Sequence, residues 1–109
     1  MGNCFVLEGG NNAIQVYTFS GTPQLSKVLS TNQVFGLPAA INRTTGVNGV
    51  YPTDIRVFYD QGINRWFILQ RAQANDAAGN PLPQSHEYIA VSQTGDPTGT
   101  YNVYSIDTT

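Results

Sequence analysis

The residues of this chain that could act in catalysis are few and lie far apart in the sequence. The single histidine, His86, stands between Ser85 and Glu87 in a polar segment. A serine nucleophile needs a histidine held beside it in space and a carboxylate that orients this histidine. Three residues that follow one another along the chain do not provide that geometry, so we expect His86 to be a surface histidine.

Potential metal ligands are equally sparse. Cys4 is the only cysteine, so neither an intrachain disulfide nor a thiolate-rich metal site can form. His86 and Cys4 together cannot supply the ligands of a zinc site. Asp54, Asp60 and Asp96 could join backbone carbonyls around calcium, but no segment has the dense Asp and Asn spacing of an EF-hand loop. No metal or other cofactor is therefore predicted.

Tyrosines near asparagines are the strongest indication of a binding site. A neutral sugar can be held by an aromatic ring against its apolar face and by amides against its hydroxyl groups. Tyr51, Tyr101 and Tyr104 are the candidate rings, Asn48 is a candidate amide and Asp54 a candidate carboxylate. The same rings could instead pack inside the fold, as aromatic residues often do. A carbohydrate site formed from these residues is one hypothesis.

Length and charge limit the remaining function classes. The chain has 109 residues, enough for one small domain, and only 11% of them are charged, against about 25% in a typical soluble domain. Five Lys and Arg residues are scattered along a chain of net charge −2. Because affinity for nucleic acid comes largely from Lys and Arg at phosphates, a nucleic-acid partner is not expected.

Membrane and targeting signals are also not found. No apolar run approaches the length of a membrane-spanning helix, so no membrane insertion is expected. The start Met1-Gly2-Asn3 does not resemble a signal peptide. An apolar segment begins almost at once, which is also what a piece of a longer protein would show.

Short apolar runs, rich in β-branched and aromatic residues and separated by turn residues, predict an all-β chain with almost no helix. The last four of these runs follow one another along the chain and should form an antiparallel meander, joined by two turns and one longer loop. The expected strands are 4–8, 13–19, 25–29, 55–59, 65–70, 88–92 and 101–106.

Two segments are expected to be loops. Residues 37–53 contain prolines and several turn residues, which predicts a long connection; a tight hairpin turn at Asn48-Gly49 is the alternative. Residues 72–85 are polar and contain two prolines, which predicts an exposed loop.

The strands of the second half are apolar on both faces. In residues 65–70, Trp66 and Ile68 occupy one face while Phe67 and Leu69 occupy the other. A sheet with one face in water would alternate apolar and polar residues. We therefore expect this sheet to be covered on both faces, with residues 101–106 as a wetter edge strand.

Four segments of the second half share a pattern with a known repeat. They are TDIRVFYD at 53–60, NRWF at 64–67, IAVS at 89–92 and GDPTGTY at 95–101. Together they resemble a blade of secreted bacterial β-propeller-like proteins, which reads approximately D-P-x-V-x-Y-D, R-W, A-V-S, and D-P-T-G before an aromatic residue. One departure is Ile55, where the motif usually has proline. Residues 3–36 resemble a weaker preceding unit.

The resemblance implies a fold of β-propeller-type antiparallel four-stranded blades, about one and a half per chain. The expected units are a partial blade or hairpin at 1–36, a connecting loop at 37–53 and a full blade at 54–109. The resemblance also implies an extracellular or cell-surface protein. It supplies no catalytic residue, because such repeats have no single activity.

The predicted function is a non-enzymatic interaction or scaffold module, with carbohydrate as a candidate ligand. One and a half blades cannot close a ring, so the apolar faces must meet copies of this chain or the remaining blades of a longer parent.

The alternative is part of a propeller glycoside hydrolase completed by other blades or subunits. Such enzymes need two carboxyl groups at a defined separation. The candidates are Asp54, at the start of the expected innermost strand, with Asp60, Glu8 and Glu87.

Overall fold

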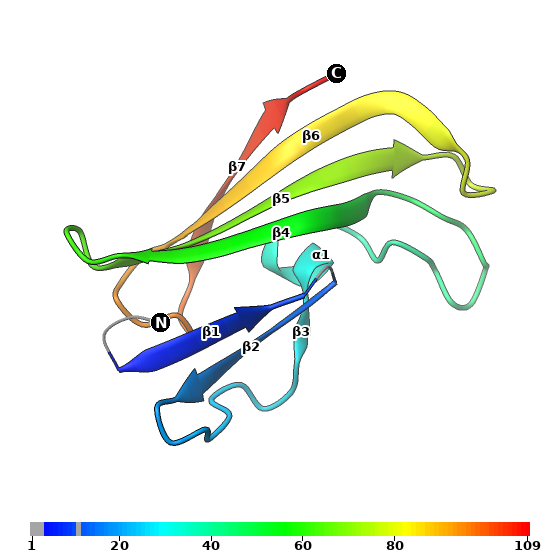
Figure 1. The fold of residues 1–109 in the computed structure, drawn as a ribbon. Coiled ribbons are helices and arrows are strands. Elements are labelled where there is room, and N and C mark those ends of the chain that lie inside the picture. Colours follow the sequence, from blue (N-terminus) through cyan, green and yellow to red (C-terminus); the bar gives the residue numbers. More distant parts are fainter. Residues whose placement is uncertain (1–3, 11) are drawn as a thin grey trace.

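The computed structural model describes residues 4–10 and 12–109 and confirms the all-β class. In this part of the chain the strands form two antiparallel sheets, and one short helix lies between them (Figure 1). The elements are β1 (Phe5–Gly9), β2 (Ala13–Thr18), β3 (Leu29–Ser30), α1 (Thr31–Val34), β4 (Tyr51–Asp60), β5 (Arg65–Asn75), β6 (Pro81–Ser92) and β7 (Tyr101–Asp107).

The smaller sheet has the order β1-β2-β3. β1 and β2 form the expected hairpin, but the strand predicted at 25–29 is wrong, since β3 contains only Leu29 and Ser30. Pro23 forms an isolated bridge with Tyr17 and has no N–H group to continue a ladder. The chain leaves β2 there and pairs with it again only at Leu29, opposite Ile14.

Helix α1 is an element that the apolar pattern did not indicate. Ser30 caps it: the Gln33 N–H donates to the Ser30 Oγ at 3.2 Å, and the Ser30 N–H donates to the Gln33 Oε1 at 3.0 Å. This reciprocal pair is a capping box, whose sequence signature is Ser-x-x-Gln. The helix has four residues, so it is too short to show an apolar periodicity.

The larger sheet has the order β4-β5-β6-β7, which confirms the antiparallel meander. The exposed loop predicted at 72–85 is wrong, because β5 and β6 extend through most of it and Ala72 is buried. Only a tight turn remains, in which the Asp76 carboxylate accepts N–H groups such as that of Asn80 at 2.9 Å. Pro81 and Pro83 are tolerated at the start of β6 because this part of the strand is not paired with β7, which pairs with β6 only from His86 onward.

The connection between the sheets ends earlier than predicted and contains a hairpin of its own. β4 already begins at Tyr51, and an isolated bridge joins Ile41 to Asn48. The turn of this small hairpin lies between these two residues, where the Asn42 Oδ1 accepts the N–H of Thr44 at 3.0 Å. The alternative, a tight hairpin turn at Asn48-Gly49, is therefore wrong.

One face of the larger sheet, which we call the inner face, packs on the smaller sheet. Trp66 and Ile68 of this face share a core cluster with Val16 and Phe35. β1 lies alongside β4 (Figure 1). At this contact Gly9 is close to Ile55, since a Cβ added at Gly9 would lie 2.8 Å from the Ile55 Cδ1.

The opposite face, which we call the outer face, is not covered by any described part of the chain. Cover for this face would have to come from a copy of this chain or from further blades of a longer parent. Phe58 is 50% exposed and Tyr104 is 54% exposed, and β7 is mostly exposed, as an edge strand should be. By register the outer face consists of Arg56, Phe58, Phe67, Leu69, Arg71, Glu87, Ile89, Val91, Asn102, Tyr104 and Ile106.

Trp66 ties the hairpins of the larger sheet together at one end. Its backbone N–H donates to the Ser92 Oγ at 2.8 Å, and its Nε1–H donates to the Gly95 carbonyl at 3.1 Å. Its ring packs on Tyr59 with 4.9 Å between centroids. The tryptophan, serine and glycine of the blade-like pattern therefore have a structural role here.

We predict that Trp66→Phe lowers the free energy of unfolding by about 2–4 kcal/mol, because it removes the indole hydrogen bond and leaves a cavity. Urea unfolding followed by circular dichroism measures this. The matched control is Tyr104→Phe, which alters an exposed aromatic side chain and should change stability by less than about 0.5 kcal/mol. Equal losses for the two variants would contradict this role of Trp66.

Candidate functional site

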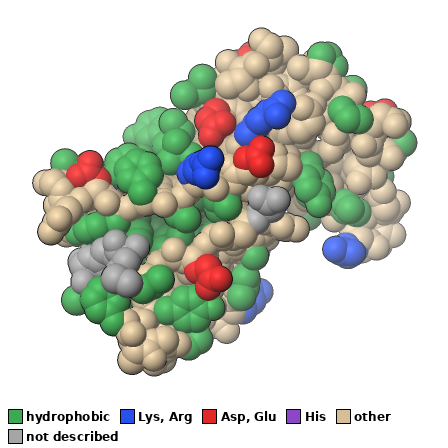
Figure 2. Space-filling view, in the orientation of Figure 1, with side chains coloured by type: hydrophobic (Ala, Val, Ile, Leu, Met, Phe, Trp, Pro, Cys, Tyr) green, Lys and Arg blue, Asp and Glu red, His purple; other side chains and the backbone are tan. Residues whose placement is uncertain are grey.

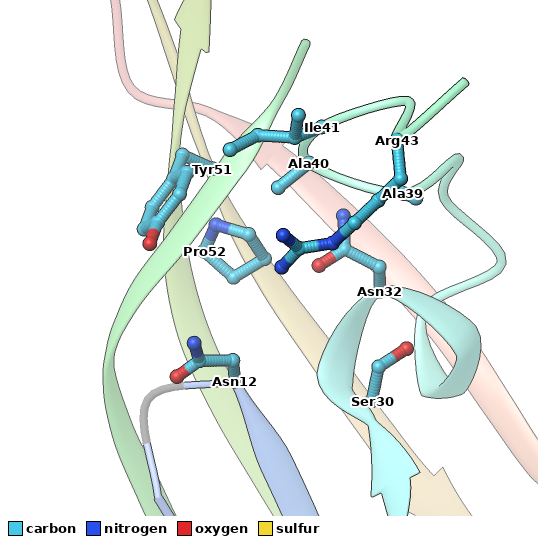
Figure 3. A pocket seen from close by; sticks show the side chains of 9 residues that line it. All are labelled: Asn12, Ser30, Asn32, Ala39, Ala40, Ile41, Arg43, Tyr51 and Pro52. Carbon is cyan, nitrogen blue, oxygen red and sulfur yellow. The ribbon is translucent and has the colours of Figure 1, made fainter. Parts of the chain in front are cut away.

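A cavity of about 260 Å³ lies where β4 begins, between α1, the end of the β1–β2 turn and the segment before β4 (Figure 3). Alanines, Ile41 and Pro52 form its apolar wall. Its polar lining consists of Asn12, Ser30, Asn32, Arg43 and Tyr51.

Hydrogen bonds from the backbone and from one side-chain amide hold two walls of this pocket together. The carbonyl of Asn12 accepts the N–H of Thr31 at 3.0 Å, which joins the β1–β2 turn to the start of α1. Asn32 is buried, and its Nδ2 donates to the carbonyls of Pro38 at 2.7 Å and Val50 at 3.4 Å. This amide therefore ties α1 to both ends of the connecting segment.

The third wall is the connecting segment itself, which is braced on its far side. The Gly49 N–H donates to the Ala40 carbonyl at 2.9 Å. The backbone N–H and the Nδ2 of Asn48 both donate to the Ala77 carbonyl, at 3.1 and 3.2 Å. Because Ala77 lies in the β5–β6 turn, the larger sheet supports this wall.

Arg43 is the charged residue of the pocket. It stands at the tip of the Asn42 turn, and its guanidinium reaches across the cavity toward Pro52 (Figure 3). Within residues 4–10 and 12–109 it has no hydrogen-bond or ion-pair partner, and no carboxylate lines the pocket. The cavity is therefore locally positive in a chain of net charge −2.

Tyr51 lies across the cavity from Arg43 and is 40% exposed (Figure 3). The Ser30 Oγ accepts the Gln33 N–H, so its own hydrogen can be donated to a ligand. The pocket thus combines a cation, a hydroxyl group, two amides and an aromatic ring. Such a set can bind a small polar molecule.

The residues predicted as ligands do not gather at one place. Tyr51 lines the pocket, while the Asn48 amide is bonded to the β5–β6 turn. Asp54 is exposed at a bulge of β4, with a left-handed φ of 56° that aspartate tolerates better than most residues. Tyr101 lies on the inner side of β7, and Tyr104 lies on its outer side.

Four polar residues of the pocket were not predicted: Asn12, Ser30, Asn32 and Arg43. The capping pattern from Ser30 to Gln33 could have placed α1. Asn42 before Arg43 is typical of a turn stabilised by an asparagine side chain. Neither signal could show that the two segments meet.

The candidate carboxylates of a hydrolase are also dispersed. The Asp60 Oδ1 accepts the Gly62 N–H at 2.8 Å in the β4–β5 turn, and Glu87 lies on the outer face. Glu8 is exposed on β1. The described residues contain no cluster of three or more His, Cys, Asp or Glu side chains that could hold a metal ion.

Tyr101 should make folding sensitive to high pH. Its hydroxyl donates to the Pro97 carbonyl at 2.9 Å, and burial, with the charge of Asp96 as a smaller cause, raises its pKa. Above pH 10 the unfolded chain releases this proton while the folded chain keeps it, so stability falls as the pH rises. We predict that the stability difference between wild type and Tyr101→Phe shrinks from pH 8 to 11. Urea unfolding at each pH measures this, and a constant difference would contradict it.

Known proteins provide no closer guide to this site. No protein-family model, no curated protein and no solved structure matches the chain. None of the helices in the described residues is long and apolar enough to cross a membrane.

Proposed function

We propose that this chain is a non-enzymatic interaction module of the β-propeller type, acting as a scaffold through the outer face of its larger sheet. The observation that carries this proposal is the apolar band across the face. Phe58, Phe67 and Val91 are neighbours by register across β4, β5 and β6. Leu69 and Ile89 lie in the next row. An extracellular or cell-surface setting belongs to the same proposal.

The rings at one end of this band are already ordered. Phe58 and Phe67 stack with 4.7 Å between centroids and 2° between ring planes. Even so, half of the Phe58 surface remains in contact with water. A preformed and exposed apolar surface of this kind is typical of an interaction site.

The accessible surface area of the chain is larger than expected for a monomer of its mass, which supports association with a partner. Its accessible surface is 6421 Å², about 500 Å² more than the ~5,900 Å² expected for a monomer of 11.8 kDa. Four strands spaced about 4.8 Å apart, each about 25 Å long, give a face of roughly 500 Å² in projection. Since side chains add relief to that face, its area approaches the ~800 Å² that each partner contributes to a standard interface.

The charges on the outer face favour a second copy of this chain as the partner. Arg71 and Glu87 are opposite each other by register, so the face carries both signs beside its apolar band. In a two-fold contact the same surface meets itself, and each arginine can then face a glutamate of the other copy. Figure 2 shows basic and acidic side chains close together on one view of the molecule.

We predict that the wild-type chain is a dimer at roughly 100 μM and that Phe58→Glu makes it a monomer, because the variant places a charge in the apolar contact. Light scattering after gel filtration measures the mass. The matched control is Phe19→Glu, which introduces the same charge at a residue that is 60% exposed but outside the outer face. A monomeric wild type, or equal dissociation of both variants, would contradict the proposal.

A second candidate function is carbohydrate binding in the Arg43 pocket. The observation that favours it is the partly exposed ring of Tyr51 opposite amides and a cation (Figure 3). This pocket shares Tyr51 with the predicted ligand residues and adds Asn12 and Asn32. The hydrolase alternative has no comparable support, because no carboxylate lines this cavity.

We predict that Tyr51→Ala abolishes the binding of monosaccharides, whereas Tyr51→Phe retains it, because the ring supplies the contact. Ligand-induced shifts in nuclear magnetic resonance spectra of the labelled protein measure both. Tyr104→Ala, at an exposed tyrosine of the outer face, is the control and should bind as wild type does. If no monosaccharide shifts any resonance of the pocket, this second function is wrong.

A further inference from the structure

We infer that the Arg43 pocket selects a sugar that carries a carboxylate, such as a hexuronate. The inference rests on the carbohydrate-binding function proposed above and names the class of ligand. It starts from the one charged side chain on the pocket wall. A guanidinium directed into a cavity without a partner is a site for an anion.

Arg43 has the geometry that a carboxylate requires. Its guanidinium points across the cavity, and no described residue bonds to it (Figure 3). Two parallel N–H donors of a guanidinium match the two oxygens of a carboxylate. Among the described residues no Asp or Glu lines the pocket, so a bound carboxylate would meet no negative charge from them.

The rest of the lining fits a sugar ring better than a bare anion. Tyr51 offers an aromatic ring across from the guanidinium, and Pro52 and alanines continue this apolar side (Figure 3). The Ser30 hydroxyl and the Asn12 amide can bond to sugar hydroxyl groups. The Asn32 Nδ2 is occupied by two carbonyls, which leaves its Oδ1 to accept a hydroxyl hydrogen.

The size of the cavity favours a single ring. Its volume of about 260 Å³ lies just below the usual range for drug-sized ligands. The walls are hydrogen-bonded to one another through Asn12, Asn32 and Gly49. A ligand would therefore meet a preformed site and need not order a loop on binding.

The test compares three ligands: glucuronate, glucose and acetate. They are titrated into the full chain while the resonances of the pocket are followed. We expect glucuronate to bind with a dissociation constant of about 1 mM. Glucose, which lacks the carboxylate, and acetate, which lacks the ring, should each bind at least about tenfold more weakly. Binding of glucuronate should weaken with added salt, because an exposed ion pair is screened.

The variant Arg43→Gln should reduce the affinity for glucuronate to about that of the wild type for glucose, because it removes the two parallel N–H donors to the carboxylate. Arg43 makes no hydrogen bond to the described chain, so this variant should fold as wild type does. The matched control is Arg56→Gln, which makes the same change of charge on the outer face and should not alter binding.

Three results would overturn the inference. Equal affinities for glucuronate and glucose would leave carbohydrate binding in place but remove the selection for a carboxylate. Acetate binding as tightly as glucuronate would identify a simple anion site. An affinity for glucuronate that is unchanged in Arg43→Gln, or that is lost in Arg56→Gln, would place the ligand elsewhere. If no sugar binds at all, the carbohydrate-binding function fails as well.

Discussion

The packing of Trp66 is the interaction on which the rest of this structure depends. The indole lies in the core between the two sheets. The backbone N–H of Trp66 donates to Ser92 and its indole N–H donates to Gly95, both on the next hairpin. A buried indole needs a partner for its N–H, and the turn after β6 supplies it. The same side chain therefore orders the meander and presents an apolar inner face to the smaller sheet.

This arrangement leaves the larger sheet with two different faces. The inner face is buried by β1, β2 and α1, whereas the outer face keeps aromatic residues such as Phe58 in water. A single chain of this size cannot cover both, since its smaller sheet has only enough residues for one layer. The proposed scaffold function follows from that imbalance, because the uncovered face is stabilised by any surface that removes it from water.

The pocket is a second consequence of how the sheets are joined. The segment between them must turn from α1 to β4, and the amides of Asn32 and Asn48 hold it in place. Arg43 lies at the tip of that segment, where no acidic residue of the described chain reaches it. The outer face and the pocket therefore differ in chemistry: one is broad and apolar, and the other is small and positive.

The sequence by itself determined the strand class, the first hairpin, the meander and the edge position of residues 101–106, because these follow from local apolar patterns and turn residues. Local patterns could not show that β5 and β6 run through the polar segment 72–85, since long-range pairing stabilises those residues. Only the tertiary structure decided which sheet face is covered and that Ser30, Asn32, Arg43 and Tyr51 surround one cavity. These residues belong to segments that meet through long-range contacts, and such contacts leave no periodic trace in a single sequence.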